Sequence, residues 1–202
     1  MFNEILGNDP IKESLVRLNA AGRVPNAIIC AGPDGVGKKL FALELARMFA
    51  CSSLIEGEAC GTCPACGRIG EFEIPARTDK NRDDFKQVFF GSHADVGIVV
   101  TYKRFILVEA IRALEDESRF RPYEARARTF IIDEAERMND AASNALLKTL
   151  EEPAETSRIV LVTSRPAALL PTIRSRCQTF RFAAVDAAEL EADICARYGI
   201  RL

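Results

Sequence analysis

The sequence predicts an α/β fold: a three-layer αβα sandwich around a mostly parallel sheet of five strands. Short apolar runs typical of buried strands alternate along the chain with amphipathic runs at helical spacing. One strand-like run leads into a glycine-rich turn, and another ends in two adjacent carboxylates. Both features are typical of sheets that bind phosphate where their parallel strands end. The 202 residues suffice for one such domain and part of a second.

The glycine-rich turn, GPDGVGK at 32–38, lies between an expected strand at 27–31 and an expected helix at 38–49. Glycines let several backbone N–H groups point inward, and the amino end of the following helix adds positive charge. The spacing therefore predicts a phosphate-binding loop. The glycines that define it are Gly32, Gly35 and Gly37.

Two lysines close this loop. Lys38 is expected to reach the outer phosphates of a nucleotide. Lys39 departs from the pattern, because this position ordinarily holds a Ser or Thr whose hydroxyl binds Mg²⁺. An ammonium has no free lone pair for a metal and repels one. The loop thus favours phosphate binding and leaves ATP with Mg²⁺ open; a turn that serves only to pack helix on strand is the alternative.

The two carboxylates, Asp133 and Glu134, follow an apolar strand expected at 129–133. At the end of a strand beside a phosphate loop, Asp133 would hold Mg²⁺ through water, and Glu134 would polarise the attacking water. Together with the glycine-rich loop they strengthen the fold prediction. Lys39 leaves open whether they support catalysis.

Four of the seven cysteines fall within one segment, CSSLIEGEACGTCPACG at 51–67. C-x2-C turns present two sulfurs to one ion with little strain, and four thiolates suit tetrahedral zinc. Such crowding argues against a disulfide framework and for a reducing compartment. The segment predicts a structural zinc site, with a redox dithiol and free buried thiols as alternatives. The expected ligands are Cys51, Cys60, Cys63 and Cys66.

The remaining elements follow from hydrophobic periodicity and chain breakers. Further strands are expected at 93–100, 158–163 and 177–182. Further helices are expected at 2–21, 106–117, 140–151, 171–176 and 186–198, with Asn8 or Asp9 capping the first. The polar stretch 69–92 is assigned only a loop and a short helix.

Two polar features outside these motifs have a structural and a functional interpretation. His93, the only histidine, lies at an expected strand end, where a local hydrogen bond is favoured over catalysis. Residues 118–128 suit a solvated surface or, alternatively, contact with phosphate or an acidic partner. The arginines of that stretch are Arg119, Arg121, Arg126 and Arg128.

Composition is ordinary for a soluble globular protein, with 48% hydrophobic and 28% charged residues. No apolar run approaches membrane-spanning length, and the amino terminus lacks a signal-peptide pattern. No membrane partner and a cytoplasmic location are therefore expected. The net charge of -2 gives no general affinity for nucleic acid, so direct DNA contact would need a local basic patch.

Several sequence blocks together resemble one family. They are GPDGVGKK at 32–39, the four-cysteine segment, HADV at 93–96, VEAIRAL at 108–114, FIIDEAERMNDAASNALLKTLEEP at 130–153 and LLPTIRSRCQ at 169–178. Over nearly all its length the chain resembles the clamp loader subunits of bacterial DNA polymerase III, which are AAA+ proteins with a P-loop fold. Among them it is most similar to the delta-prime type, whose own nucleotide site is commonly degenerate.

The resemblance implies roles for individual residues. The glycines, Lys38, Asp133 and Glu134 match the nucleotide site, and Ser164 matches a polar sensor position. Arg176, within SRC, matches an arginine finger that acts on nucleotide in the neighbouring subunit. An always-charged guanidinium at a subunit edge can stabilise charge on a transferring phosphoryl group.

The resemblance also implies a domain plan: an AAA+ core at 1–182, a zinc module inserted at 51–67, and the beginning of a helical lid at 183–202, inside which the chain stops. The implied function is that of a stator-like subunit of the polymerase III holoenzyme, a nucleotidyltransferase, with little ATPase activity of its own. Its partners would be gamma/tau-like and delta-like subunits and, indirectly, the sliding clamp and primed DNA. The alternatives are an active gamma/tau-like ATPase and a zinc-stabilised adaptor for DNA or a DNA-binding protein.

Overall fold

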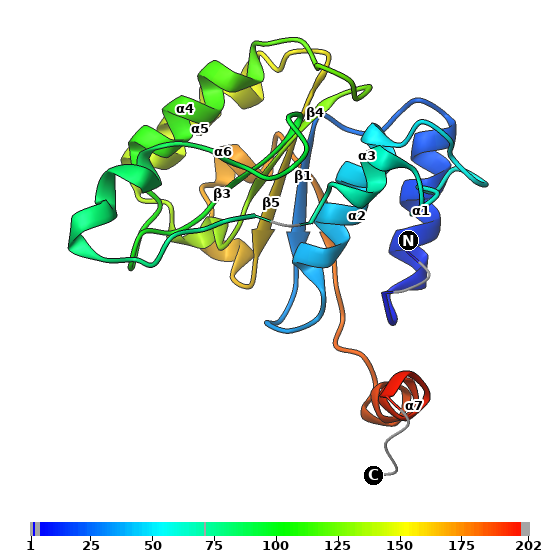
Figure 1. The fold of residues 1–202 in the computed structure, drawn as a ribbon. Helices are drawn as coiled ribbons and strands as arrows, with labels where there is room; N and C mark the ends of the chain where they lie inside the picture. Colours follow the sequence, from blue (N-terminus) through cyan, green and yellow to red (C-terminus); the bar gives the residue numbers. More distant parts are fainter. Residues whose placement is uncertain (1, 3–4, 71, 199–202) are drawn as a thin grey trace.

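The computed structural model describes residues 2, 5–70 and 72–198 and shows a six-stranded sheet with helices on both faces (Figure 1). The strand order is β2-β3-β4-β5-β1-β6. The predicted three-layer α/β sandwich is confirmed. The strands are β1 (Ala27–Ala31), β2 (Phe89–Phe90), β3 (Val96–Val99), β4 (Arg128–Ile132), β5 (Ser157–Thr163) and β6 (Gln178–Arg181).

Five strands are parallel, as predicted, and the sixth corrects the predicted count of five. β2 pairs antiparallel with β3, with Phe89 opposite Ile98 and Phe90 opposite Gly97. Two residues are too few for an alternating pattern to be recognised in the sequence. Gly97 makes room at this position, because a Cβ there would lie 2.4 Å from a methyl of Val88.

Helices cover both faces of the sheet, and alternate residues of β1 show the division. Ile28 and Cys30 face the core under α1 and α2, whereas Ala27, Ile29 and Ala31 face the core under α4, α5 and α6. β1 is buried on both faces, which explains its unbroken apolar run. The helices are α1 (Asp9–Ala20), α2 (Lys38–Ala50), α3 (Pro64–Gly67), α4 (Val108–Ser118), α5 (Asp140–Glu151), α6 (Pro171–Arg174) and α7 (Ala187–Tyr198).

The first helix is shorter than the predicted 2–21. It begins at Asp9 because Gly7 and Asn8 have left-handed backbones, with φ of 69° and 58°, which a right-handed helix cannot include. Asn8 occupies the cap position without a capping hydrogen bond. Its side chain instead pairs with the backbone of Ala183, accepting from the N–H at 2.9 Å and donating to the carbonyl at 3.3 Å. This pairing ties α1 to the segment after β6.

Other predicted elements shift at their ends. The strand predicted at 93–100 is β3, which begins only at Val96, and the helix predicted at 106–117 begins at Val108. Ile106 forms a bridge to Met138 in place of a first helical turn. Within 69–92 the short helix is a 3₁₀ helix, Asp79–Lys86.

After β6 the chain leaves the sandwich and enters α7, which stands apart from the sheet in Figure 1. This helix agrees with the one predicted at 186–198. Residues 199–202 lie outside the described residues. The assignment of 183–202 to a lid stays a prediction.

Candidate functional site

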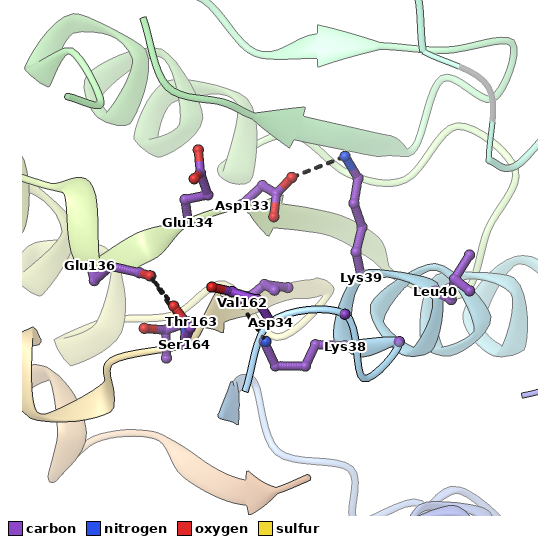
Figure 2. Close-up of a pocket in the computed structure, with 12 residues that line it drawn as sticks. Asp34, Lys38, Lys39, Leu40, Asp133, Glu134, Glu136, Val162, Thr163 and Ser164 are labelled. Atoms are coloured by element: carbon purple, nitrogen blue, oxygen red, sulfur yellow. Dashed lines mark hydrogen bonds and ion pairs between the residues drawn. The ribbon is translucent and has the colours of Figure 1, made fainter. Parts of the chain in front are cut away.

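The glycine-rich loop joins the end of β1 to the start of α2, as the sequence predicts (Figure 2). Gly37, directly before α2, has a φ of 82°, which glycine adopts without strain. Gly32 is required for a different reason: a Cβ there would lie 2.5 Å from the carbonyl oxygen of Phe182. The loop is therefore packed closely against the segment that follows β6.

An open pocket of about 320 Å³ lies where the parallel strands end, an edge of the sheet that we call the carboxyl edge (Figure 2). The pocket brings together most residues predicted for the nucleotide site. Its lining comprises Asp34, Gly35, Gly37, Lys38, Lys39, Leu40, Asp133, Glu134, Glu136, Val162, Thr163 and Ser164.

Both lysines of the loop are engaged within the chain. The buried Lys38 ammonium donates to the carbonyl oxygens of Gly32, at 2.8 Å, and of Pro33. The Lys39 ammonium crosses the pocket and lies 2.9 Å from Oδ2 of Asp133 (Figure 2). Lys39 thus pairs with the carboxylate that would hold Mg²⁺, and its positive charge opposes a metal ion at that position.

Glu134 is also engaged and points away from Lys38 (Figure 2). Its backbone is left-handed, with a φ of 52°. One carboxylate oxygen accepts a hydrogen bond from Nε of Arg137 at 2.9 Å, and the other accepts from the hydroxyl of Thr101 at 3.0 Å. These two contacts fix the direction of the Glu134 carboxylate, although each oxygen can accept a further hydrogen bond.

Glu136 belongs to the pocket, although the sequence interpretation missed it. Its Oε1 accepts hydrogen bonds from the hydroxyl of Ser164 at 2.8 Å and from the N–H of the same residue at 3.3 Å (Figure 2). Burial acts to raise the pKa of Glu136, but hydrogen bonds from Ser164 and Thr163 outweigh it, so the pKa is lowered. Ser164, the predicted sensor, is therefore coupled to the acidic strand end. The sequence could have indicated this role, because Glu136 follows Asp133 and Glu134 in the run DEAE at 133–136.

Arg176 lies at the opposite end of the sheet, which we call the amino edge because the parallel strands begin there. It precedes β6 and borders a small cavity with Asn26, which precedes β1. Its side chain is 37% exposed. A strand of five residues separates the two edges by roughly 16 Å. Arg176 is thus open to a partner and distant from the pocket of its own chain.

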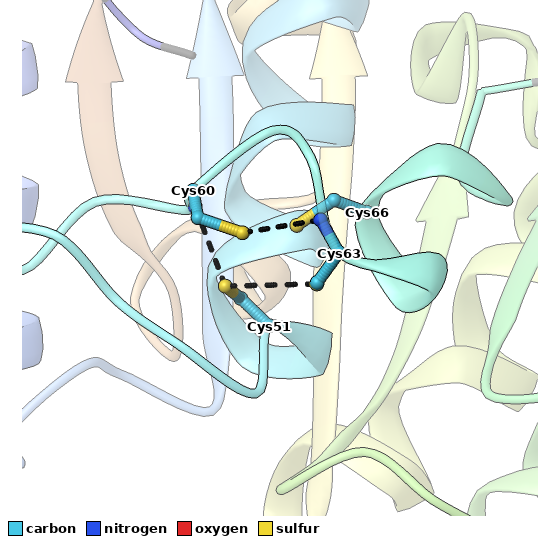
Figure 3. Close-up of side chains that lie close together, drawn as sticks. All are labelled: Cys51, Cys60, Cys63 and Cys66. Atoms are coloured by element: carbon cyan, nitrogen blue, oxygen red, sulfur yellow. Dashed lines mark hydrogen bonds between the residues drawn. The ribbon is translucent and has the colours of Figure 1, made fainter.

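The four cysteines gather at the end of α2, as predicted (Figure 3). Their sulfurs all lie within 4.8 Å of one another. Four thiolates about 2.3 Å from a tetrahedral zinc ion would be roughly 3.8 Å apart. The sulfurs of Cys51 and Cys63 are 4.0 Å apart, so the cluster has the dimensions to hold one metal ion.

Backbone N–H groups turn toward these sulfurs. Cys60 donates its N–H to the sulfur of Cys51, and Cys63 donates to that of Cys60, both at 3.3 Å. The N–H of Cys66 lowers the pKa of Cys63 to about 5, those of Thr62 and Cys63 lower the pKa of Cys60, and burial raises the pKa of Cys66. Sulfurs that accept such bonds as thiolates form a suitable donor set for a cation.

The cysteine segment is anchored to neighbouring elements. Arg47 of α2 donates to the carbonyl oxygens of Cys66, at 3.3 Å, and Ile69, at 2.6 Å. Arg68 makes two 2.7 Å hydrogen bonds to the carboxylate of Glu124. The cysteine segment (51–67) and the stretch 118–128, which we call the arginine-rich loop, are far apart in the sequence. These contacts place them side by side at the amino edge.

A buried carboxylate that the sequence did not single out shapes the arginine-rich loop. Asp95, only 1% exposed, accepts hydrogen bonds from the N–H groups of Tyr123 at 2.8 Å and of Glu124 and Ala125 at 2.9 Å. Burial acts to raise the pKa of Asp95, but these N–H groups and Arg128 outweigh it and lower the pKa. The carboxylate clamps the loop to the start of β3.

The loop is largely a solvated surface, as predicted: Arg119, Arg121 and Arg126 are exposed. Arg128 is buried, forms an ion pair with Glu117 at 2.9 Å and lies over the ring of Phe130. Arg126 donates to the carbonyl oxygen of Met48. These two side chains hold the loop in place, and of the four arginines in the stretch only Arg128 is buried.

His93 follows the structural interpretation. It is 1% exposed, and its Nδ1 accepts a hydrogen bond from the N–H of Asp95 at 3.2 Å, so the predicted local hydrogen bond is confirmed. Burial lowers its pKa. His93 does not line the carboxyl-edge pocket.

A parallel sheet with a P-loop pocket at its carboxyl edge defines an α/β protein of the AAA+ P-loop class, and solved structures agree on the fold. A DNA polymerase III gamma subunit-related protein from Thermotoga maritima aligns with a TM-score of 0.61 and 24% identity over 93% of this chain and 50% of that chain. The RuvB Holliday junction branch migration motor of the same organism aligns with a TM-score of 0.56 and 19% identity over 94% and 49%.

Sequence comparison defines the family. The model of the family described as DNA polymerase III, delta subunit, matches residues 7–186, so the chain belongs to that family. It is 31% identical over 202 residues to the gamma/tau subunit of Mycobacterium tuberculosis, covering 98% of this chain and 32% of that protein. It is 35% identical over 162 residues to the delta' subunit of Bacillus subtilis, covering 79% and 43%. The chain thus spans about a third of the first relative and less than half of the second.

These comparisons confirm the resemblance to clamp loader subunits at the level of the family. Because the relatives include both delta-prime and gamma/tau types, they do not separate the two. Across residues 2, 5–70 and 72–198, no helix has the length and apolar character needed to span a bilayer.

Proposed function

We propose that this chain is the core of a delta-prime-type clamp loader subunit, which helps to load a sliding clamp onto primed DNA within a hetero-oligomer of related subunits. In this proposal its own pocket does not hydrolyse ATP. Arg176 acts in trans on the nucleotide that a neighbouring ATPase subunit binds. A cytoplasmic location follows from a role in bacterial DNA replication.

The ion pair between Lys39 and Asp133 carries this proposal. At 2.9 Å the ammonium satisfies the carboxylate that catalysis would need for Mg²⁺. The P-loop glycines also have a packing role, because the absence of a side chain at Gly32 lets the backbone of Phe182 approach closely. The chain therefore keeps the shape of a nucleotide site while its metal position is filled by its own side chain.

The position of Arg176 supports the action in trans. A guanidinium at the amino edge is open to a neighbour, and its charge persists at any physiological pH. Arginine fingers supplied by another subunit accelerate phosphoryl transfer by roughly 10³-fold or more. A neighbour that presents its own carboxyl edge to this amino edge would bring its phosphates to Arg176.

Reconstitution tests the proposal. The chain, extended to its full-length protein, would be assembled with ATPase-competent gamma/tau subunits, and DNA-stimulated ATP hydrolysis measured. Arg176→Ala is expected to lower turnover at the neighbouring site by about 10³-fold. Arg174→Ala, which removes an exposed arginine two residues away, serves as the matched control and should leave turnover near the unaltered level. Equal rates for the two variants would reject the role of Arg176.

An active gamma/tau-like ATPase is the second candidate. It is favoured by the match to gamma/tau over 98% of this chain and by the gathering of Lys38, Asp133, Glu134 and Ser164 around one pocket. This candidate predicts ATP turnover by the chain alone that Glu134→Gln abolishes. The absence of such turnover would favour the delta-prime-type proposal.

We also propose that the cysteine cluster holds one structural zinc ion. The four sulfurs lie close enough together to share one ion, and backbone N–H groups that point at Cys51 and Cys60 favour their thiolate forms. Four protein ligands would leave no open coordination position, so the ion would brace the segment and take no part in hydrolysis. Elemental analysis of protein purified without chelator should return one zinc per chain.

A further inference from the structure

The guanidinium of Arg176 is held by two partners at the amino edge. Its Nη2 lies 2.8 Å from Oε1 of Glu151, and its Nη1 donates to the carbonyl oxygen of Thr172 at 3.1 Å. Glu151 is the last residue of α5, and Thr172 lies within α6. Two separate helices therefore fix the direction in which the guanidinium points.

Both partners are rooted in the core. Leu150, next to Glu151, is buried, and Ile173, next to Thr172, is fully buried. Arg176 also borders a cavity of about 90 Å³ whose lining includes Leu150 and Pro153. An arginine stem commonly lies along such apolar surface while its head group stays in water. The two contacts of the guanidinium are thus made with helices that are anchored in the core.

These contacts leave the guanidinium able to bind more. An arginine carries five N–H donors. Nη1 donates one hydrogen bond to Thr172 and Nη2 forms an ion pair with Glu151, so donors remain for a phosphate. The Glu151 carboxylate is about half exposed, so its pairing with Arg176 is screened by water and contributes little to stability. Its larger effect is to limit the conformations that a long, flexible side chain explores before a phosphate arrives.

We infer that Glu151 is a positioning residue for the arginine finger: it holds the guanidinium of Arg176 in the orientation that meets the phosphates bound by the neighbouring subunit. The inference rests on the proposed trans role of Arg176. Glu151 touches neither nucleotide nor metal in this account. Its effect passes through Arg176 alone.

A double-mutant cycle tests the inference in the reconstituted full-length assembly. Glu151→Ala is expected to lower the kcat of ATP hydrolysis about 10-fold with little change in KM for ATP, because orientation is lost and binding is not. Glu151→Gln should recover most of the rate, since its amide oxygen still accepts from Nη2. Combined with Arg176→Ala, Glu151→Ala should cause no further loss. Glu155→Ala, which removes an exposed glutamate in the turn after α5, is the matched control.

The outcomes separate the inference from the proposed function. If Arg176→Ala has no effect, the trans role fails. If Arg176→Ala slows hydrolysis but Glu151→Ala matches the control, or raises the rate, the positioning role fails alone. A further loss in the double variant would also overturn it. Thermal melting of each variant verifies folding; Glu151→Ala should fold normally, because an acidic residue at a helix carboxyl end is not stabilising.

Discussion

Each edge of the sheet holds a basic side chain in an ion pair, but the two pairs lie in different surroundings. At the carboxyl edge, Lys39 and Asp133 satisfy each other across the pocket. At the amino edge, Arg176 is held at its tip by Glu151 yet keeps a surface exposed to partners. Lys39 and Arg176 are similarly exposed, at 42% and 37%, but their partners differ: Asp133 is 23% exposed and lines the pocket, whereas Glu151 is 51% exposed. This difference is what we expect of a subunit that contributes to a neighbouring active site and performs little chemistry in its own.

The amino edge also contains two features that can hold its loops in place. The cysteine cluster follows the end of α2, and the Asp95 carboxylate clamps the adjoining loop through three N–H groups. Rigid support of this kind keeps an edge in the shape that a partner recognises.

The largest expected effect is the loss of the zinc ion that we propose for the cysteine cluster. Binding of structural zinc contributes roughly 10 kcal/mol in small zinc-dependent domains, so removing it should unfold the segment 51–67. Chelation, or Cys60→Ser, should lower the melting temperature and raise amide exchange at the amino edge while exchange around the P-loop stays slow. Cys195→Ser, in α7, is the control. If Cys60→Ser leaves the melting temperature unchanged, the cluster does not stabilise the segment 51–67.

Asp95 should give the next largest effect. Removing the carboxylate in Asp95→Ala leaves three N–H groups and the buried Arg128 without it, which should cost about 3–5 kcal/mol of unfolding free energy. The pKa of Asp95 is lowered in the fold, so its stabilisation is present above the ordinary carboxyl pKa of about 4. It is lost as pH falls through the lowered pKa.

Urea unfolding at pH 7 and pH 3 measures both parts of the Asp95 prediction. The difference between the unaltered chain and Asp95→Ala should be large at pH 7 and smaller at pH 3. Asp84→Ala, at an exposed position, provides the baseline. A difference of the same size at both pH values would mean that the charge of Asp95 contributes nothing.

A smaller effect is expected when the carboxyl edge is opened. Lys39→Thr supplies a hydroxyl in place of the ammonium and frees Asp133, so Mg²⁺ should strengthen ATP binding at least about 10-fold, or roughly 1.4 kcal/mol. Calorimetry with and without Mg²⁺ would measure this gain. Lys103→Thr, which breaks an exposed pair with Asp79, is the control. If the unaltered chain already gains as much from Mg²⁺, the ion pair does not close the site.

The smallest effect should come from Arg68→Ala. Its pair with Glu124 links the cysteine segment to the arginine-rich loop, but both side chains are more than a third exposed. Such pairs contribute less than about 1 kcal/mol. Equilibrium unfolding should therefore change little, and a loss above 3 kcal/mol would show that the link between the two segments is a major part of the brace.

Patterns confined to one stretch of chain could be predicted from the sequence. The P-loop, the strand that ends in Asp133 and the four cysteines all follow from local spacing, and the structure brings each group together. The contact between Lys39 and Asp133 could not be predicted, because 94 positions separate the residues and only the sheet order brings them together. The role of Asp95 could not be predicted for the same reason, since its three partners lie 28 to 30 residues away.

Other misses have local causes. β2 has two residues, which is below the length at which alternation can be seen. Glu136 was passed over because Glu134, beside Asp133, matched a familiar motif, whereas the structure pairs Ser164 with the later glutamate. The first helix was predicted to begin too early, at residue 2, because an apolar pattern does not reveal the left-handed backbone at Asn8.

The most direct test changes one edge at a time in the same reconstituted full-length assembly and measures steady-state ATP hydrolysis. The account predicts that Glu134→Gln in this subunit leaves the rate near the unaltered level, whereas Arg176→Ala in this subunit lowers turnover at the neighbouring site by about 10³-fold. The reverse result, with hydrolysis sensitive to Glu134→Gln and indifferent to Arg176→Ala, would contradict it.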